Sequence, residues 1–190
     1  MTDENTFDTL RNMIQKQLVK ENSGQDYAQV MRVFQSAVRM AQYEAEVDMD
    51  VLKAATLLHD MAYGKRFYKK DHSLESAKLS KEVLSRKQFT KEQIEHIIRC
   101  IEQHNIWVKV DPNSSIETKI LRDADRLDHL GHTGIVRAIA YATLAGERYI
   151  DTLNAFYNLK DTFETQKGKE FAKQRIKITK NFLKHLEAEY

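Results

Sequence analysis

The sequence predicts an all-α fold. Apolar residues recur at helical spacing almost from one end of the chain to the other, and no segment alternates as a β-strand does. The 190 residues include only six Gly and one Pro. A sandwich or barrel needs a turn residue about every 8–12 positions, so these folds are disfavoured. The length is typical of one domain of about 100–200 residues, and we expect residues 1–190 to form a single domain.

The first three expected helices are separated by breaking and capping residues. Apolar positions at helical spacing lie within residues 10–18 and again within residues 27–41. The sequence Asn-Ser-Gly at residues 22–24 breaks the first helix from the second. Asp48 is a suitable N-cap for a third helix, which we expect to run to about Gly64.

Capping boxes open two of the later helices. Thr90 followed by Gln93 predicts one helix start, and Ser114 followed by Glu117 predicts another, which opens a helix over residues 116–130. The remaining helical segments are residues 135–144, after Gly131 and Gly134, and a last segment that places Phe171, Ile178, Phe182 and Leu186 on one stripe. The periodicity therefore predicts roughly eight or nine helices.

The charge balance and the single cysteine indicate a cytoplasmic protein. Thirty Lys and Arg nearly balance 28 Asp and Glu, so the chain as a whole has no strong field for nucleic acid or membrane. The acidic, polar N-terminus does not resemble a signal peptide, and no run approaches the roughly 18 apolar residues of a membrane span. Cys100 has no partner for an internal disulfide and lies between Ile97 and Ile101, so we expect a buried, unreactive thiol.

Two polar residues interrupt the most apolar of the expected helices. Residues 51–62 are apolar around most of the helix circumference, which predicts a buried helix, except at His59 and Asp60. A carboxylate buried there costs several kcal/mol unless a cation, a metal or hydrogen bonds compensate it. The pair therefore indicates a functional site. The alternative is a helix end at which His59 packs and Asp60 meets solvent or a lysine.

A second cluster of ionisable groups lies within residues 122–132. Asp125 and His129 are four residues apart and share a helix face, as metal ligands from one helix often do, whereas Asp123 points elsewhere. The alternative is a solvated face of Asp and Arg pairs, each worth about 0.2–0.5 kcal/mol. Periodicity alone does not choose between them.

Together the two clusters resemble the HD-domain phosphohydrolase superfamily, in which a His, an adjacent His-Asp and a distant Asp form the pattern. The matching stretches are LLHDMA at residues 57–62 and LRDADRLDHLG at residues 121–131. Three further stretches resemble the small stand-alone bacterial members, namely GQDYAQVMRV, EQHN and the Gly-x-x-Gly-Ile-x-Arg that begins at Gly131. The resemblance covers about residues 22–146 and leaves the terminal helices unassigned.

The resemblance implies the HD-domain helical fold and a metal-dependent hydrolase. It makes His59, Asp60 and Asp125 ligands of a divalent ion, with Mg or Mn expected, and gives Asp60 the catalytic role of orienting the attacking water. Asp123 becomes a supporting residue. The implied reaction is hydrolysis of a phosphate ester or anhydride in a small phosphorylated substrate, most simply a nucleotide.

The sequence departs from the family pattern at the first ligand, where Gln29 stands in place of His. An amide oxygen can bind a hard cation, but it is neutral and does not replace imidazole for a borderline metal. Three consequences are open: a weakened site of Mg or Mn type, rescue by His129 or His132, or a protein that keeps the fold and no longer hydrolyses. The family's acidic pair after His-Asp is also absent, which disfavours guanosine tetraphosphate hydrolysis and the deoxynucleotidase reaction.

Several residues near these motifs could bind the substrate. We assign Lys65, His104 and Arg126 to phosphate binding, with a solvated loop or a packing role as the alternative. His72 could bind phosphate or a second metal, and Trp107 could stack on a base, although packing is a frequent role for both residue types.

A basic stretch at the C-terminus supports a second class of function. Seven cations face one acid between residues 167 and 184. They are Lys167, Lys169, Lys173, Arg175, Lys177, Lys180 and Lys184. Such a patch could hold nucleic acid or an acidic partner, so the alternative function is a catalytically impaired HD-fold protein that binds a nucleotide, nucleic acid or protein. A solvated face of a packing helix would give the same pattern.

Overall fold

The structure is a computed structural model that describes residues 4–19, 24–63 and 72–189. These residues form α-helices and no strand, so the predicted all-α class is confirmed. The α-helices are α1 (Glu4–Gln17), α2 (Tyr27–Ala41), α3 (Met49–Leu58), α4 (His72–Leu84), α5 (Lys91–Glu102), α6 (Ile116–Asp128), α7 (Gly131–Ala145), α8 (Tyr149–Asn158) and α9 (Gln166–Ala188). Within the described ranges, no helix combines the length and the apolar character that crossing a membrane requires.

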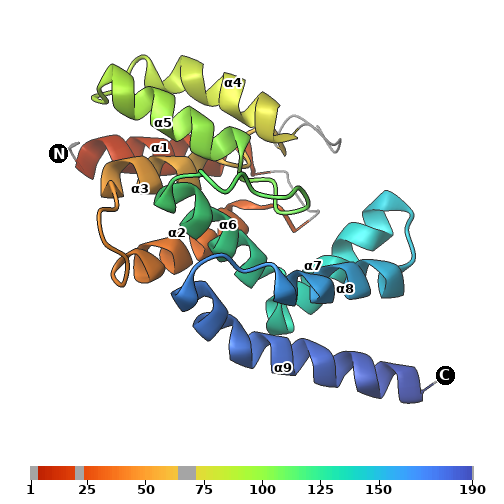
Figure 1. The fold of residues 1–190 in the computed structure, drawn as a ribbon. Helices are drawn as coiled ribbons and strands as arrows, with labels where there is room; N and C mark the ends of the chain where they lie inside the picture. Colours follow the sequence, from red (N-terminus) through yellow and green to blue (C-terminus); the bar gives the residue numbers. More distant parts are fainter. Residues whose placement is uncertain (1–3, 20–23, 64–71, 190) are drawn as a thin grey trace.

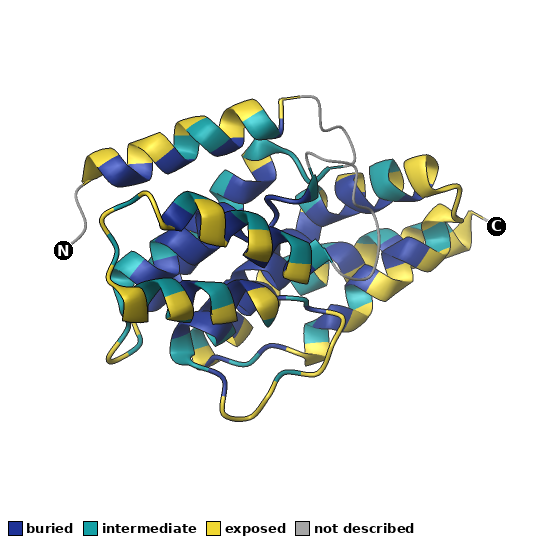
Figure 2. Cartoon of the chain, turned by 90° about the horizontal axis from the view of Figure 1, so that it is seen from above, coloured by how far each residue is buried: buried dark blue, intermediate teal, exposed yellow. Residues whose placement is uncertain are grey.

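The helix α3 lies at the centre of the larger apolar core. It packs against α1, α2, α5 and α6, and α2 in turn packs along α6. Figure 1 shows α4 and α5 packed together at the top, α7 and α8 together at the right, and α9 along the bottom. The helices turn buried faces inward and exposed faces outward, as Figure 2 shows. This arrangement brings the end of α3 and the middle of α6 into the interior of the molecule.

The helix α3 ends earlier than the sequence predicts. We expected it to run to about Gly64, whereas it spans Met49–Leu58 and is capped by His59. The imidazole Nδ1 of His59 donates to the Thr56 carbonyl over 2.8 Å. A continuing helix would use that carbonyl for the backbone N–H of Asp60, so the side chain replaces the next helical bond. His59 and Asp60 therefore lie at the tip of α3 and not along its side.

One predicted capping box is present and the other is wrong by one residue. Thr90 and Gln93 form the reciprocal box that opens α5. The N-cap of α6 is Ser115, whose hydroxyl accepts from the backbone N–H of Thr118. Ser114 instead donates to a glutamine side chain at the end of α5. Two adjacent serines give the same local signal, and a contact to another helix decides which of them caps.

A buried carboxylate fastens the start of α9 to α6. Asp123 is fully buried and accepts hydrogen bonds from the backbone N–H groups of Glu164 and Thr165 and from the Thr165 hydroxyl. Arg126 also donates to it over 3.0 Å. A Cβ at Gly168 would come within 2.3 Å of the same carboxylate, so this position of α9 requires glycine. Asp123 thus has a structural role that agrees with its predicted supporting one.

We expect Asp123→Ala to lower the free energy of unfolding by about 3 kcal/mol or more, because it leaves the N–H groups of Glu164 and Thr165 without their acceptor and removes one of the two carboxylates that pair with Arg126. Urea unfolding followed by circular dichroism measures the change. Asp161→Ala is the matched control, because the Asp161 side chain is 76% exposed and makes only a surface pair with Lys160. Equal effects of the two substitutions would contradict the anchoring role.

Candidate metal centre

Three segments that are distant in the sequence meet around one buried amide. Gln29 comes from the first turn of α2, His59 from the tip of α3 and Asp125 from α6, and all three are buried. The Gln29 Nε2 lies 3.4 Å from the His59 Nε2 and donates to the Asp125 Oδ1 over 3.4 Å. The structure therefore brings together the position of the missing family His and two predicted ligands.

Asp60 continues this group on its other side. Its Oδ2 lies 3.3 Å from the His59 Nε2. Burial lowers the pKa of His59, but the charges of Asp60 and Asp125 outweigh burial and raise this pKa to about 9. Burial would raise the pKa of Asp60, yet His59 and a hydrogen bond from His104 hold it well below its usual range. Without another cation, a proton on His59 neutralises the buried carboxylate.

The second oxygen of Asp60 faces two more histidines. The Asp60 Oδ1 lies 3.4 Å from the His104 Nε2 and 3.8 Å from the His72 Nε2. The two Nε2 atoms are 3.1 Å apart. His104 donates its Nδ1 to the Ile101 carbonyl, which fixes the ring so that Nε2 faces Asp60. Burial and the neighbouring His104 lower the pKa of His72 to about 4, so its ring is neutral at pH 7.

These donor atoms fit a divalent ion. Asp60, His72 and His104 each offer one ligand atom, and these atoms lie within 4.8 Å of one another. Neighbouring ligands around one ion with bonds of about 2.1 Å are about 3.0–3.4 Å apart, close to the spacing observed here. The Gln29 Oε1 is also buried, and it has no hydrogen-bond partner among the residues that the structure describes. Imidazole donors favour a first-row transition ion over Mg, so of the two expected ions Mn fits better.

The two histidines named as possible replacements for the first ligand lie in different surroundings. His129 is buried, and its Nδ1 contacts the Asp125 carbonyl at 2.8 Å and the Asp125 Oδ1 at 3.5 Å. Burial and Arg137 lower the pKa of His129. His132 is exposed and lines a separate cavity of about 440 Å³ together with Arg32. Rescue of the Gln29 position by either residue stays a prediction.

The residues predicted to bind substrate are distributed unevenly. His104 lies in the metal-compatible group just described. Arg126 is buried, and its guanidinium donates to the carboxylates of Asp123 and Glu164. Lys65 lies outside the described residues.

An ion-pair network that the sequence does not predict lies behind the site. Arg32 of α2 and Arg137 of α7 both pair with the buried carboxylate of Asp128, over 2.7 and 2.8 Å. All three residues belong to motifs quoted above, but a motif gives no partner across the fold. The network joins α2 and α7 to α6. Arg32 and Asp128 each lie about one helical turn after a residue of the site, Gln29 in α2 and Asp125 in α6.

Comparison with known proteins identifies the family. The sequence model of the HD domain matches residues 27–130, more than half of the chain. The chain belongs to the HD domain family. The match confirms the family resemblance drawn from the motifs, and its range includes Gln29, His59, Asp60 and Asp125.

Related HD-fold proteins match the chain over nearly its whole length. Bacillus subtilis YpgQ is 28% identical over 194 residues, 94% of this chain and 90% of YpgQ. The crystal structure of YpgQ in complex with ADP is similar with a TM-score of 0.81 at 26% identity, and covers 100% of this chain and 97% of that one. An HD-superfamily hydrolase from Bacillus thuringiensis shares the fold, with a TM-score of 0.72, 24% identity, and coverage of 98% and 97%.

We expect Gln29→His to strengthen Mn²⁺ binding by roughly 10- to 100-fold, because an imidazole replaces a neutral amide beside His59 and Asp125. Titration calorimetry on protein freed of metal measures the affinity. Gln174→His, which adds a histidine on the exposed face of α9, is the control for unspecific binding. An unchanged affinity in Gln29→His would show that Gln29 does not occupy a ligand position or that another residue already fills it.

Proposed function

We propose that the protein is a metal-dependent phosphohydrolase that cleaves a phosphate ester or anhydride, with a nucleotide as its substrate. The observation that carries the proposal is the buried carboxylate of Asp60, which lies between His59 on one side and His72 and His104 on the other. Membership of a hydrolase superfamily supports the reaction class. The similarity to YpgQ, which was crystallised with ADP, supports a nucleotide.

The residues proposed to hold a divalent ion are Asp60 and its neighbours. They are His59, Asp60 and Asp125, as the family pattern implies, and His72 and His104 on the other side of Asp60. A divalent ion bound there would lower the pKa of a water molecule toward neutrality and offset charge on the phosphoryl oxygens.

The protein groups have separable roles in this proposal. Asp60 accepts a hydrogen bond from the attacking water and so orients it. The backbone carbonyls of Thr56 and Ile101 hold the rings of His59 and His104 in position. Lys65 remains the proposed contact for phosphate charge. Arg126 would have to give up a bond to Asp123 or Glu164 to reach a substrate.

The second candidate is a member of the family that binds without hydrolysing. Gln29 favours it, because this amide removes one ligand of the family pattern and donates to Asp125. The exposed basic face of α9 favours a macromolecular ligand in that case. This face consists of Lys169, Lys173, Lys177, Lys180 and Lys184.

We expect the wild type to hydrolyse a nucleoside di- or triphosphate with Mn²⁺, and EDTA to abolish the reaction. Asp60→Asn should lower the turnover by about 100-fold or more, because the group that orients the water loses its charge. Release of phosphate and pyrophosphate from a nucleotide panel measures the activity.

Asp151→Asn is the matched control for this experiment. Its side chain is 66% exposed and pairs only with an exposed arginine, so turnover should not change. Nucleotide binding without hydrolysis under Mn²⁺ or Mg²⁺ would support the second candidate over the first.

The basic face of α9 gives a further test of the two candidates. For an enzyme that acts on small nucleotides, Lys173→Glu with Lys177→Glu should leave kcat/KM within about two-fold, because exposed charges more than about 8 Å from a site are largely screened. For a nucleic-acid module, the same double change should weaken binding and lower its log-log salt slope by about one per lost phosphate contact. Salt-dependent nucleic-acid binding that survives Asp60→Asn, together with no hydrolysis by the wild type under any metal, would contradict the enzyme.

A further inference from the structure

Trp107 is an exposed aromatic residue beside the candidate metal centre. It follows His104 by three residues, in the loop after α5, and is 53% exposed. Its ring lies perpendicular to that of His129, with centroids 6.1 Å apart. The His129 Nδ1 is 3.5 Å from the Asp125 Oδ1. Trp107 is thus close in sequence to His104 of the candidate centre, and its ring contacts His129, which in turn contacts Asp125.

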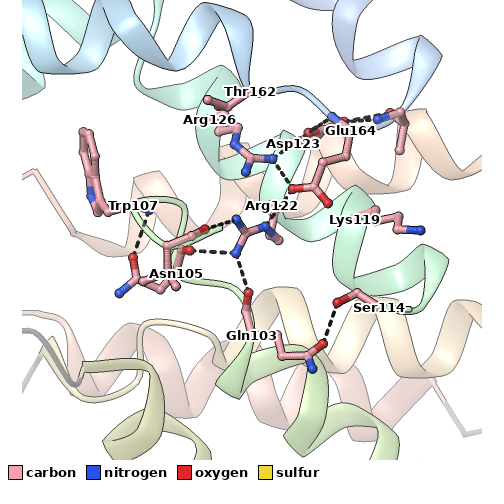
Figure 3. A network of polar contacts seen from close by, with 12 residues as sticks. Gln103, Asn105, Trp107, Ser114, Lys119, Arg122, Asp123, Arg126, Thr162 and Glu164 are labelled. Carbon is pink, nitrogen blue, oxygen red and sulfur yellow. Dashed lines mark hydrogen bonds and ion pairs between the residues drawn. The ribbon is translucent and has the colours of Figure 1, made fainter. Parts of the chain in front are cut away.

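A buried arginine holds the loop that carries Trp107. Arg122 is 2% exposed, and its guanidinium donates over 2.6 Å to the carbonyls of Gln103, Asn105 and Val108. In Figure 3 these bonds gather on Arg122, and the indole of Trp107 extends away from them. The Trp107 backbone N–H donates to the Asn105 Oδ1, which fixes the turn.

The indole also rests on a second ring. The Phe156 ring lies beside it, with centroids 5.9 Å apart and planes inclined by 39°, and His129 packs against the same Phe156 with centroids 4.5 Å apart. The orientation of Trp107 is therefore set by the protein before any ligand binds. A preformed aromatic surface loses little conformational entropy on binding, which favours recognition of a flat ligand.

We propose that Trp107 is the platform on which the base of a nucleoside phosphate stacks when its phosphates reach the Asp60 centre. The proposal rests on the proposed function for the phosphate end, and adds the residue that recognises the other end of the substrate. Every base has an aromatic face, so stacking binds bases without strong sequence preference. Inorganic phosphate compounds have no such face and do not use Trp107.

The chain offers a direct probe, because Trp107 is its only tryptophan. ADP added in the presence of Mn²⁺ should change the indole fluorescence excited at about 295 nm, where adenine hardly absorbs, whereas inorganic pyrophosphate should not. Trp107→Ala should weaken ADP binding in calorimetry by about 5- to 150-fold, the range reported for stacking of a base on an aromatic side chain. Its affinity for pyrophosphate should stay within about two-fold, and Trp107→Phe should restore most of the ADP affinity.

Leu144→Ala is the matched control, since Leu144 is equally exposed, at 54%, but lies in the last turn of α7. ADP binding that is the same in Trp107→Ala and in wild type would overturn the platform and leave the proposed function intact. Equal losses of ADP and pyrophosphate affinity would overturn it too, since they would mean that Trp107 supports the centre and does not contact the base. Failure of the wild type to bind ADP at all would overturn both the platform and the nucleotide part of the proposed function.

Discussion

The buried carboxylate of Asp60 is the constraint on which the rest of the site depends. A carboxylate that is 3% exposed is costly without compensation, and here the compensation comes from imidazoles on both of its oxygens. The two nearest imidazoles, His59 and His104, are oriented in the same way, each donating Nδ1 to a carbonyl three residues earlier at the end of a helix. The C-terminal ends of α3 and α5 therefore meet at Asp60. Helix C-termini carry partial negative charge, so both favour a cation at this place.

The ionisable residues in the C-terminal half of α6 make three different sets of contacts. The sequence allowed a solvated face of Asp and Arg pairs, but the ionisable residues from Arg122 to His129 are all buried. Asp123 and Arg126 fasten the segment before α9, Asp128 joins α2 to α7, and Asp125 faces Gln29 in the site. Because these residues contact different neighbours, the same turns of α6 present Asp125, a predicted ligand, on one face and hold the surrounding helices through their other faces.

The sequence predicted the features that depend on local patterns. The helical class, the Thr90 cap and the burial of Cys100 follow from periodicity and capping chemistry. It did not predict the early end of α3, because that end depends on a bond from the His59 ring to its own helix. Nor did the sequence predict that His72 and His104 both face the Oδ1 atom of Asp60. Periodicity gives the face of a helix on which a residue lies, but not the helix that packs against that face.

Gln29 affects the two sides of Asp60 differently. On the side of His59 and Asp125, the amide presents its N–H to the Asp125 carboxylate, and its own oxygen is buried without a partner in the described part of the chain. Use of that oxygen as a ligand requires the amide to turn and to lose the bond to Asp125. On the other side, the His72 and His104 nitrogens already face each other and the Asp60 Oδ1. An ion would therefore need a rearrangement on the first side and little on the second, so we expect Gln29 to weaken the centre while the metal-compatible donors His72 and His104 stay in place.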